Sequence, residues 1–170
     1  MNEKYNVTDD FLSQEEHDII KSITLKNRYL PLFYKDSVST STSNDGFYFT
    51  HTFFTQEDGV NSDYFAAIED IFLKKLNPKT LLRVQYNFYV GTPEIKTHGW
   101  HVDYARKHKG FLYYLNTNNG QTHIQINETD AVGIRSIEKR GLLFDASNPH
   151  RSTTCSDKEF RANIIFNYHD

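Results

Sequence analysis

Three residues that are far apart in the sequence carry side chains that could bind one metal ion. His101 and Asp103 are separated by a single residue in the stretch "THGWHVDYARKHKGFLYYLN". On an extended strand, residues i and i+2 point to the same face with Cα atoms about 6.6 Å apart, so an imidazole and a carboxylate can share one cation. His150, in "NPHRSTTCSDKEFRANIIFNYHD", would supply a third ligand. The three together would leave coordination positions open for other molecules.

The order of these residues matters more than the pair itself, because a His-x-Asp match arises by chance in a chain with 8 histidines. His150 follows the apolar run "GLLFD", and Arg161 begins the last strand-like run. Their separation of 11 residues is odd, so one unbroken strand would point them in opposite directions. The polar stretch "RSTTCSDKE" supplies a turn, and we therefore expect both to face one cavity. Two histidines and a carboxylate form the ligand set of non-haem Fe(II) oxygenases.

Two helices are predicted in the first half of the chain. "LSQEEHDIIKSI" has the Ser13–Glu16 spacing of a capping box, followed by apolar residues at helical intervals. "SDYFAAIEDIFLKKLNP", residues 62–78, predicts a second helix that Pro78 ends. The elements predicted between the helices are two aromatic strands, 29–36 and 47–54, and a polar, mobile loop, 37–46.

From residue 81 onward the apolar residues recur every second position, which indicates strands. The runs 81–90 and 160–169 each have an apolar row and a polar row. An ordinary sheet would put the polar rows in water, whereas a barrel would let both rows line its wet mouth while helices cover its apolar backs. We favour the second alternative: an α+β, mainly β double-stranded β-helix (jelly roll) with the N-terminal helices packed on one sheet. The polar rows are Arg83, Gln85, Asn87 and Tyr89, and Arg161, Asn163 and Asn167.

Length and composition indicate one domain over residues 1–170. The net charge of −3 gives no general attraction to nucleic acid or to anionic membranes. A single cysteine, Cys155, excludes an intrachain disulfide framework and a cysteine-rich zinc site. The sequence shows no apolar run of about 20 residues and no secretory signal, so we expect a cytoplasmic protein. The oligomeric state stays open.

On these residues the chain resembles the Fe(II)- and 2-oxoglutarate-dependent dioxygenases of the prolyl 4-hydroxylase-like branch. The His-x-Asp…His…Arg pattern of that family matches His101, Asp103, His150 and Arg161. "FYVG", "FLYYLNTNNG" and "RANIIFNYHD" also resemble family segments, so that residues 81–170 match well. "FTHTFF" and "YLNTNNG" are similar to small uncharacterised dioxygenases of marine bacteriophages, which implies the cytoplasm of a host cell.

The resemblance implies an oxidoreductase that hydroxylates a C–H bond and releases succinate and CO2. The substrate would be a prolyl or other amino-acid side chain, in a peptide or a free amino acid, and nucleic acid and membranes are not expected as partners. The implied cofactors are Fe(II), 2-oxoglutarate and O2, with ascorbate as an optional addition. The implied catalytic and metal-binding residues are His101, Asp103 and His150, and the implied cosubstrate-binding residues are Arg161, Tyr114 and Tyr89.

Two alternative functions remain. The first is a nucleobase demethylase of the same superfamily, whose Arg-x5-Arg pattern would place a second arginine six residues after Arg161. Asn167 stands there, and the net charge is negative, so this alternative is weaker. The second alternative is a non-catalytic jelly-roll module that binds a ligand.

Four neighbouring features have more than one interpretation. His98 would face away from His101 on a strand, as a surface residue or a neighbour of the ligands, and Trp100 would be core or rim. Arg151 points oppositely to His150 if the strand continues, which makes it a weaker anchor than Arg161. The basic stretch "ARKHKG" is either a solvated turn or a place where an anionic substrate is met by three side chains, Arg106, Lys107 and Lys109.

Overall fold

Two antiparallel sheets form most of the computed structural model, which describes residues 4–39 and 46–170. The larger sheet comprises β1 (Tyr5–Thr8), β2 (Phe33–Lys35), β3 (Tyr48–Thr55), β4 (Gly59–Val60), β5 (Thr80–Val90), β6 (Lys109–Tyr114), β9 (Gly141–Asp145) and β11 (Phe160–His169). The smaller sheet comprises β7 (Gln121–Gln125), β8 (Ala131–Arg135) and β10 (His150–Ser152).

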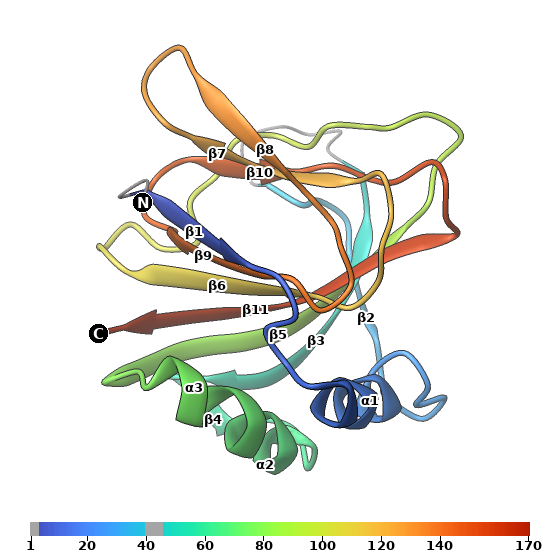
Figure 1. Ribbon diagram of the computed structural model, residues 1–170, viewed down its shortest axis with the longest axis vertical. Helices are drawn as coiled ribbons and strands as arrows, with labels where there is room; N and C mark the ends of the chain where they lie inside the picture. The colour runs from blue at the N-terminus through green and yellow to red at the C-terminus, as the bar shows by residue number, and fades with distance from the viewer. Residues whose placement is uncertain (1–3, 40–45) are drawn as a thin grey trace.

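The strand order places β5 and β11 in the middle of the larger sheet. Its order is β1-β9-β6-β11-β5-β3-β2, with β4 paired to β3, and the order of the smaller sheet is β10-β7-β8. Figure 1 shows the smaller sheet on one side of the larger sheet and the helices on the other. This arrangement confirms the predicted mainly β jelly roll with N-terminal helices on one sheet.

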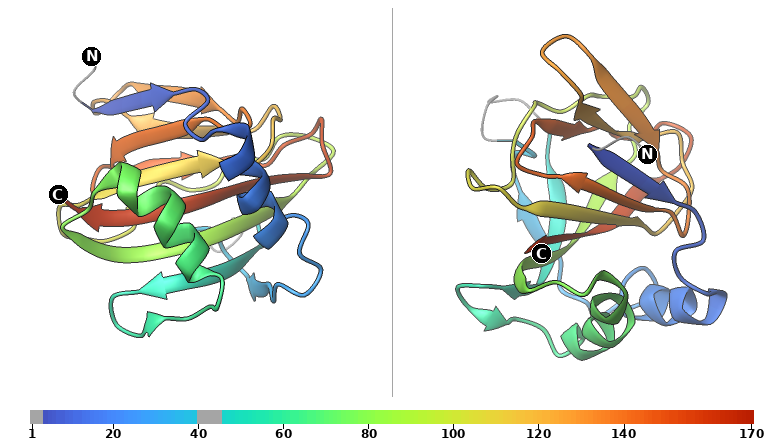
Figure 2. Two further views of the ribbon diagram at one scale, coloured as in Figure 1. Left: turned by 60° about the horizontal axis from the view of Figure 1, so that its bottom comes forward. Right: turned by 60° about the vertical axis from the view of Figure 1, so that its left-hand side comes forward.

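The helices follow the predicted pattern with one local change. α1 (Gln14–Ile23) begins at the predicted capping box, in which Ser13 and Glu16 hydrogen-bond to each other's backbone N–H groups. The second helical segment consists of α2 (Phe65–Ile68), a π-helical turn (Glu69–Leu73) and α3 (Lys74–Leu76). It ends at Asn77, which has a left-handed backbone with a φ of 45°, immediately before Pro78. Both segments lie against the outer face of the larger sheet (Figure 2).

The main core lies between these helices and the apolar rows of β5 and β11. Phe72, from the π-helical turn, is fully buried, and its ring lies 4.7 to 6.4 Å from four other aromatic rings. Because the apolar rows face the helices, the polar rows of β5 and β11 face the interior between the two sheets. The barrel alternative for these rows is therefore correct, and the alternative that put them in water is wrong.

Several predicted boundaries are wrong for local reasons. The strand predicted over 29–36 is reduced to β2, because Asn27 turns the preceding chain by accepting hydrogen bonds from the N–H groups of Tyr29 and Leu30. The run "GIRSIE", residues 133–138, has the apolar alternation of a strand, but β8 begins earlier, at Ala131, because a turn at Asn127 closes a hairpin with β7. β1, β4 and β10 were not predicted. Residues 40–45 of the predicted mobile loop lie outside the described part, in which no helix is long and apolar enough to span a membrane.

The packing of Phe72 predicts a large loss of stability when its ring is removed. Phe72→Ala should lower the free energy of unfolding by about 3 to 5 kcal/mol, because it leaves a cavity among well-packed rings. Urea unfolding followed by circular dichroism measures the change. Phe33→Ala is the matched control, since Phe33 is 59% exposed on the edge strand and should change stability by only about 0.5 kcal/mol. Equal losses for both variants would contradict this description of the core.

Candidate metal centre and anion site

A cavity of about 200 Å³ lies between the two sheets. Its wall combines the polar rows of β5 and β11 with β10 and with residues 101–103, which belong to the segment that crosses from β5 to β6. Among the residues that the structure describes, the cavity is lined by one carboxylate, Asp103, and by the guanidiniums of two arginines, Arg83 and Arg161. An interior with this composition has a surplus of positive charge.

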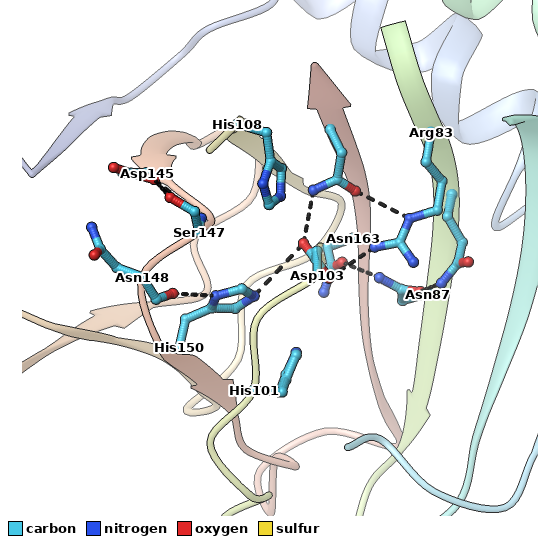
Figure 3. A network of polar contacts seen from close by, with 12 residues as sticks. Arg83, Asn87, His101, Asp103, His108, Asp145, Ser147, Asn148, His150 and Asn163 are labelled. Atoms are coloured by element: carbon cyan, nitrogen blue, oxygen red, sulfur yellow. Dashed lines mark hydrogen bonds and ion pairs between the residues drawn. The ribbon is translucent and has the colours of Figure 1, made fainter. Parts of the chain in front are cut away.

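The structure brings His101, Asp103 and His150 together (Figure 3). His101 pairs with His150 as in an antiparallel sheet, with both N–H···O distances at 2.9 Å and the ring centroids 4.6 Å apart. The candidate ligand atoms of the three residues all lie within 4.8 Å of one another. The sequence spacing thus identified three side chains that could hold one ion.

Hydrogen bonds to the backbone set the orientation of both imidazole rings. Nδ1 of His101 donates to the Gly99 carbonyl at 3.2 Å, and Nδ1 of His150 donates to the Asn148 carbonyl at 3.0 Å. In the neutral ring, a proton on Nδ1 leaves Nε2 with the lone pair that a metal requires. Burial lowers the pKa of His150, although Asp103 acts in the opposite direction. The lowered pKa favours the neutral ring.

Asp103 is held by two side chains that the sequence-based prediction missed. Arg83 Nη2 donates to its Oδ1 at 2.9 Å, Asn167 Nδ2 donates to its Oδ2 at 2.8 Å, and Arg83 Nε donates to Asn167 Oδ1 at 3.1 Å. Burial alone would raise the pKa of Asp103, but the Arg83 guanidinium and the Asn167 amide outweigh it and hold that pKa well below its ordinary value. The carboxylate is therefore ionised. The signal for this role was the position of Arg83 on the polar row of β5.

Arg161 is fully buried at the start of β11 and lines the same cavity. Its guanidinium donates to the Ser136 hydroxyl at 2.7 Å, to the Thr122 hydroxyl at 2.8 Å and to the Thr153 carbonyl at 3.4 Å. All three partners are neutral, and no carboxylate in the described residues forms an ion pair with it. A charge removed from water requires a counter-ion, so this guanidinium is suited to bind an anion from outside the chain.

The two predicted tyrosines lie beside Arg161. Its guanidinium carbon is 5.3 Å from the ring centroid of Tyr89 and 5.7 Å from that of Tyr114. Tyr89 lines the cavity, and its ring is stacked on Tyr48 and on His98. The Tyr114 hydroxyl donates a hydrogen bond to the Thr122 hydroxyl, which also accepts one from Arg161. Tyr114 therefore helps to position Thr122 and, through it, the guanidinium.

Tyr113 and His98 lie close in the sequence to predicted site residues, but neither of them lines the cavity. Tyr113, next to Tyr114, faces the core, where its hydroxyl lies 2.7 Å from His17 Nδ1. Tyr114, the next residue on β6, points to the opposite face of the strand and lies beside Arg161. His98 is buried beside Tyr89, with Nδ1 2.7 Å from the Ser152 hydroxyl, and is not a surface residue.

The basic stretch 105–110 does not line this cavity. Arg106 donates to Gln56, Lys109 pairs with Asp170, and Lys107 borders a separate hollow beside β1. These contacts favour the solvated turn over a substrate contact. Arg151 follows His150 on β10, where it pairs with His123 of β7, and its guanidinium carbon lies 4.3 Å from the ring centroid of Trp100. Neither neighbour lines the cavity, so this side chain points away from His150, as expected for a continuing strand.

Comparisons with known proteins bear on the fold. No protein-family model and no curated protein sequence matches the chain. Among solved structures, it is similar to a prolyl hydroxylase from Trichoplax adhaerens in complex with a peptide fragment of the oxygen degradation domain of hypoxia inducible factor. The TM-score is 0.73 at 19% identity, over 98% of this chain and 84% of that chain.

Two further structures extend this likeness. An oxidoreductase of the 2OG-Fe(II) oxygenase family from Burkholderia pseudomallei gives a TM-score of 0.76 at 11% identity, over 98% of this chain and 85% of that one. The non-haem α-ketoglutarate-dependent epimerase SnoN from nogalamycin biosynthesis gives 0.67 at 10% identity, over 99% and 79%. At such identities the likeness establishes the fold, and the chain has the jelly-roll fold of these 2-oxoglutarate oxygenases.

Proposed function

We propose that the protein is an Fe(II)- and 2-oxoglutarate-dependent dioxygenase that hydroxylates a C–H bond of a prolyl or other amino-acid side chain. One observation carries the proposal. An open His–Asp–His cluster and a buried arginine without a carboxylate partner among the described residues line one cavity. A metal ion would bind to the His–Asp–His cluster, and one carboxylate of a dicarboxylate cosubstrate would pair with the buried arginine.

The residues fit these two ligands in their chemistry. His101 and His150 offer their Nε2 atoms, because each Nδ1 hydrogen-bonds to a backbone carbonyl, and Asp103 offers an ionised carboxylate; together they form the ligand set that suits Fe(II). Bound Fe(II) and 2-oxoglutarate would supply the oxidising chemistry that inserts one atom of O2 into a C–H bond, with release of succinate and CO2. Arg161 would donate to the far carboxylate of 2-oxoglutarate, beside Tyr89 and Tyr114.

The rest of the cavity wall controls water and orientation. The apolar side chains of Leu112, Phe144 and Ile165 line it and limit the access of water to the metal ligands. Phe144 also packs edge-on against the ring of His150, with centroids 5.0 Å apart, which fixes that ligand. These contacts hold the ligand atoms in place before any substrate arrives.

The nucleobase demethylase remains the weaker alternative. Asn167 occupies the position where that class has its second arginine, and its amide is used to hold Asp103. A non-catalytic module has no physical need for an open ligand set and an unpaired buried guanidinium in the same cavity. The similar prolyl hydroxylase was solved with a peptide, which supports an amino-acid side chain as substrate.

Removing one metal ligand should abolish both metal binding and turnover. In His101→Ala, the binding of Mn(II), measured by calorimetry, should weaken by at least about 100-fold, because one of three protein ligands is lost. Succinate formation from 2-oxoglutarate and Fe(II) should fall with it. His169→Ala is the control, since His169 lies at the end of β11 outside this cavity. Succinate formation that persists without added iron would refute the proposal.

Removing the guanidinium should separate cosubstrate binding from metal binding. Arg161→Gln should raise the Kd of 2-oxoglutarate for the Mn(II)-loaded protein by about 100-fold, because a desolvated, charge-assisted contact is lost. Arg135→Gln, on the exposed edge of β8, should leave that Kd unchanged. Ligand uptake that does not depend on metal would favour the binding module, and repair of a methylated oligonucleotide would favour the demethylase.

The pairing of Arg83 with Asp103 predicts a stability effect whose size depends on the metal. Arg83→Met leaves a largely buried carboxylate without its counter-ion and should destabilise the metal-free protein by about 2 kcal/mol, allowing for the partial exposure of both groups. Bound Zn(II) or Mn(II) replaces that charge, so the loss should be smaller in the loaded protein. Urea unfolding with and without metal measures the difference.

The double variant Arg83→Met/Asp103→Asn provides the control, because it removes both charges and should recover part of the lost stability without metal. Equal destabilisation of the metal-free and metal-loaded proteins by Arg83→Met would show that Arg83 is not the counter-ion that the metal replaces.

A further inference from the structure

We propose that the stacked pair Trp100 and Arg151 fixes the register of the segment that carries His101, and thereby turns this candidate ligand toward His150. The inference rests on the proposed function, because it concerns the ligand set of the same site. Neither Trp100 nor Arg151 would touch the metal ion, the cosubstrate or the substrate, so both are positioning residues.

The pairing of the segment 96–101 with the chain around β10 contains one extra residue. Thr97 is paired with Thr153, and His101 is paired with His150. The backbone hydrogen bonds that accompany both pairs measure 2.9 Å. Between these two pairs, the first segment has three residues and the second has two. An extra residue on one side of an antiparallel pair is a β-bulge, a feature that can re-aim the side chains that follow it.

This bulge decides which residue stands opposite His150. In a regular ladder that continued from the pair of Thr97 and Thr153, Trp100 would stand there, and His101 would point to the outer face of the smaller sheet. A slip of one residue moves each side chain of a strand to its other face. With the extra residue in place, His101 stands opposite His150 and lines the cavity.

The side chains of this segment agree with the bulge. His98 lies on the cavity side, because its Nδ1 is 2.7 Å from the hydroxyl of Ser152, which lines the cavity. His101 lines the cavity too, although three residues of a regular strand would reverse the face. The carbonyl of Gly99 accepts the hydrogen bond from Nδ1 of His101 at 3.2 Å, so the backbone of the bulge also orients the ligand ring.

The contact between Trp100 and Arg151 requires the bulged register. The guanidinium carbon of Arg151 lies 4.3 Å from the ring centroid of Trp100, within the range of a cation–π contact. Arg151 alternates with His150 on β10 and therefore lies on the outer face. In the slipped register, Gly99 would stand opposite Arg151, and it has no side chain to stack there. The stack thus stabilises the register in which His101 faces the cavity over the register in which it does not.

The backbone alone specifies this register weakly. Within the described residues, the segment 96–101 is not part of a named strand, and its pairing with the chain around β10 consists of two isolated bridges. The Nε atom of Arg151 is buried and has no hydrogen-bond partner among the described residues. The stacked indole of Trp100, rather than a hydrogen bond at Nε, therefore holds this guanidinium in place.

Amide hydrogen exchange of the metal-free, full-length chain tests the register directly, because the N–H groups of His101 and His150 bond to each other's carbonyls. Arg151→Met keeps the length of the side chain and removes its charge. It should lower the protection of these two amides by about tenfold, while the amides of β5 and β11 keep theirs. Arg151→Lys keeps a cation against the ring and should retain most of the protection.

Metal affinity measures the consequence for the ligand set. The Kd of Mn(II), measured by calorimetry, should rise about tenfold in Arg151→Met and in Trp100→Leu. It should rise less than about threefold in Arg151→Lys and Trp100→Phe, which keep a cation and a ring. The double variant Trp100→Leu/Arg151→Met should be no worse than either single variant, because both changes remove one contact. Phe72→Leu is the control for general destabilisation and should leave this Kd unchanged.

Three results would overturn the inference. The first is unchanged amide protection and unchanged Mn(II) affinity in Arg151→Met. The second is an equal loss in Arg151→Lys and Arg151→Met, which would assign the effect to packing rather than to the cation. The third is additive losses in the double variant, which would mean that Trp100 and Arg151 act independently.

Failure of this inference can be told apart from failure of the proposed function. A wild-type protein that binds no Mn(II) refutes the proposed function, and hydrogen exchange of the metal-free chain still decides whether the stacked pair fixes the register. A wild-type protein that binds Mn(II) and 2-oxoglutarate, with variants that keep both the protection and the affinity, refutes only the role of Trp100 and Arg151.

Discussion

A charged group that is removed from water requires an opposite charge beside it. In the cavity of this protein, only some of the buried charged groups have such a partner within the described residues. The described lining has two guanidiniums, those of Arg83 and Arg161, and one carboxylate, Asp103, which is already paired with Arg83. Burying unpaired charges destabilises a folded chain. The arrangement is therefore understandable only if anions and a cation from outside complete it, and the whole cavity depends on this incomplete pairing.

The fold makes this arrangement possible by separating two environments across one sheet. On β5 and β11, one face packs against Phe72 and the helices, and the opposite face carries the polar row. Because the side chains of a strand alternate, a stable apolar core on one side automatically presents polar groups to the other. The smaller sheet then closes over that polar face and contributes His150. Stability is supplied by one face and binding by the other.

The sequence predicts the parts of this design that are local. The capping box of α1, the period of two in β5 and β11, and the His101–Asp103 spacing depend on neighbouring residues, and they identified the fold and the three candidate ligands. The clamp on Asp103 depends on the register that places Asn167 opposite Arg83, and on a crossing segment that passes both. Register between distant strands is not encoded in spacing along the chain, so the role of Arg83 was missed.

The same register explains why the opposite charges of the cavity do not cancel one another. Arg161 and Asp103 line one cavity, and a direct ion pair between them would occupy both the candidate anion site and a candidate metal ligand. Along the two central strands, Arg161 is paired with Tyr89 at one end, and Asn167 is paired with Arg83 at the other. Between them lie neutral amides, in which Gln85 donates to Asn87 at 2.6 Å and Asn87 donates to Asn163 at 3.1 Å. These amides satisfy one another, keep the charged ends apart, and so leave each end available for a ligand of its own.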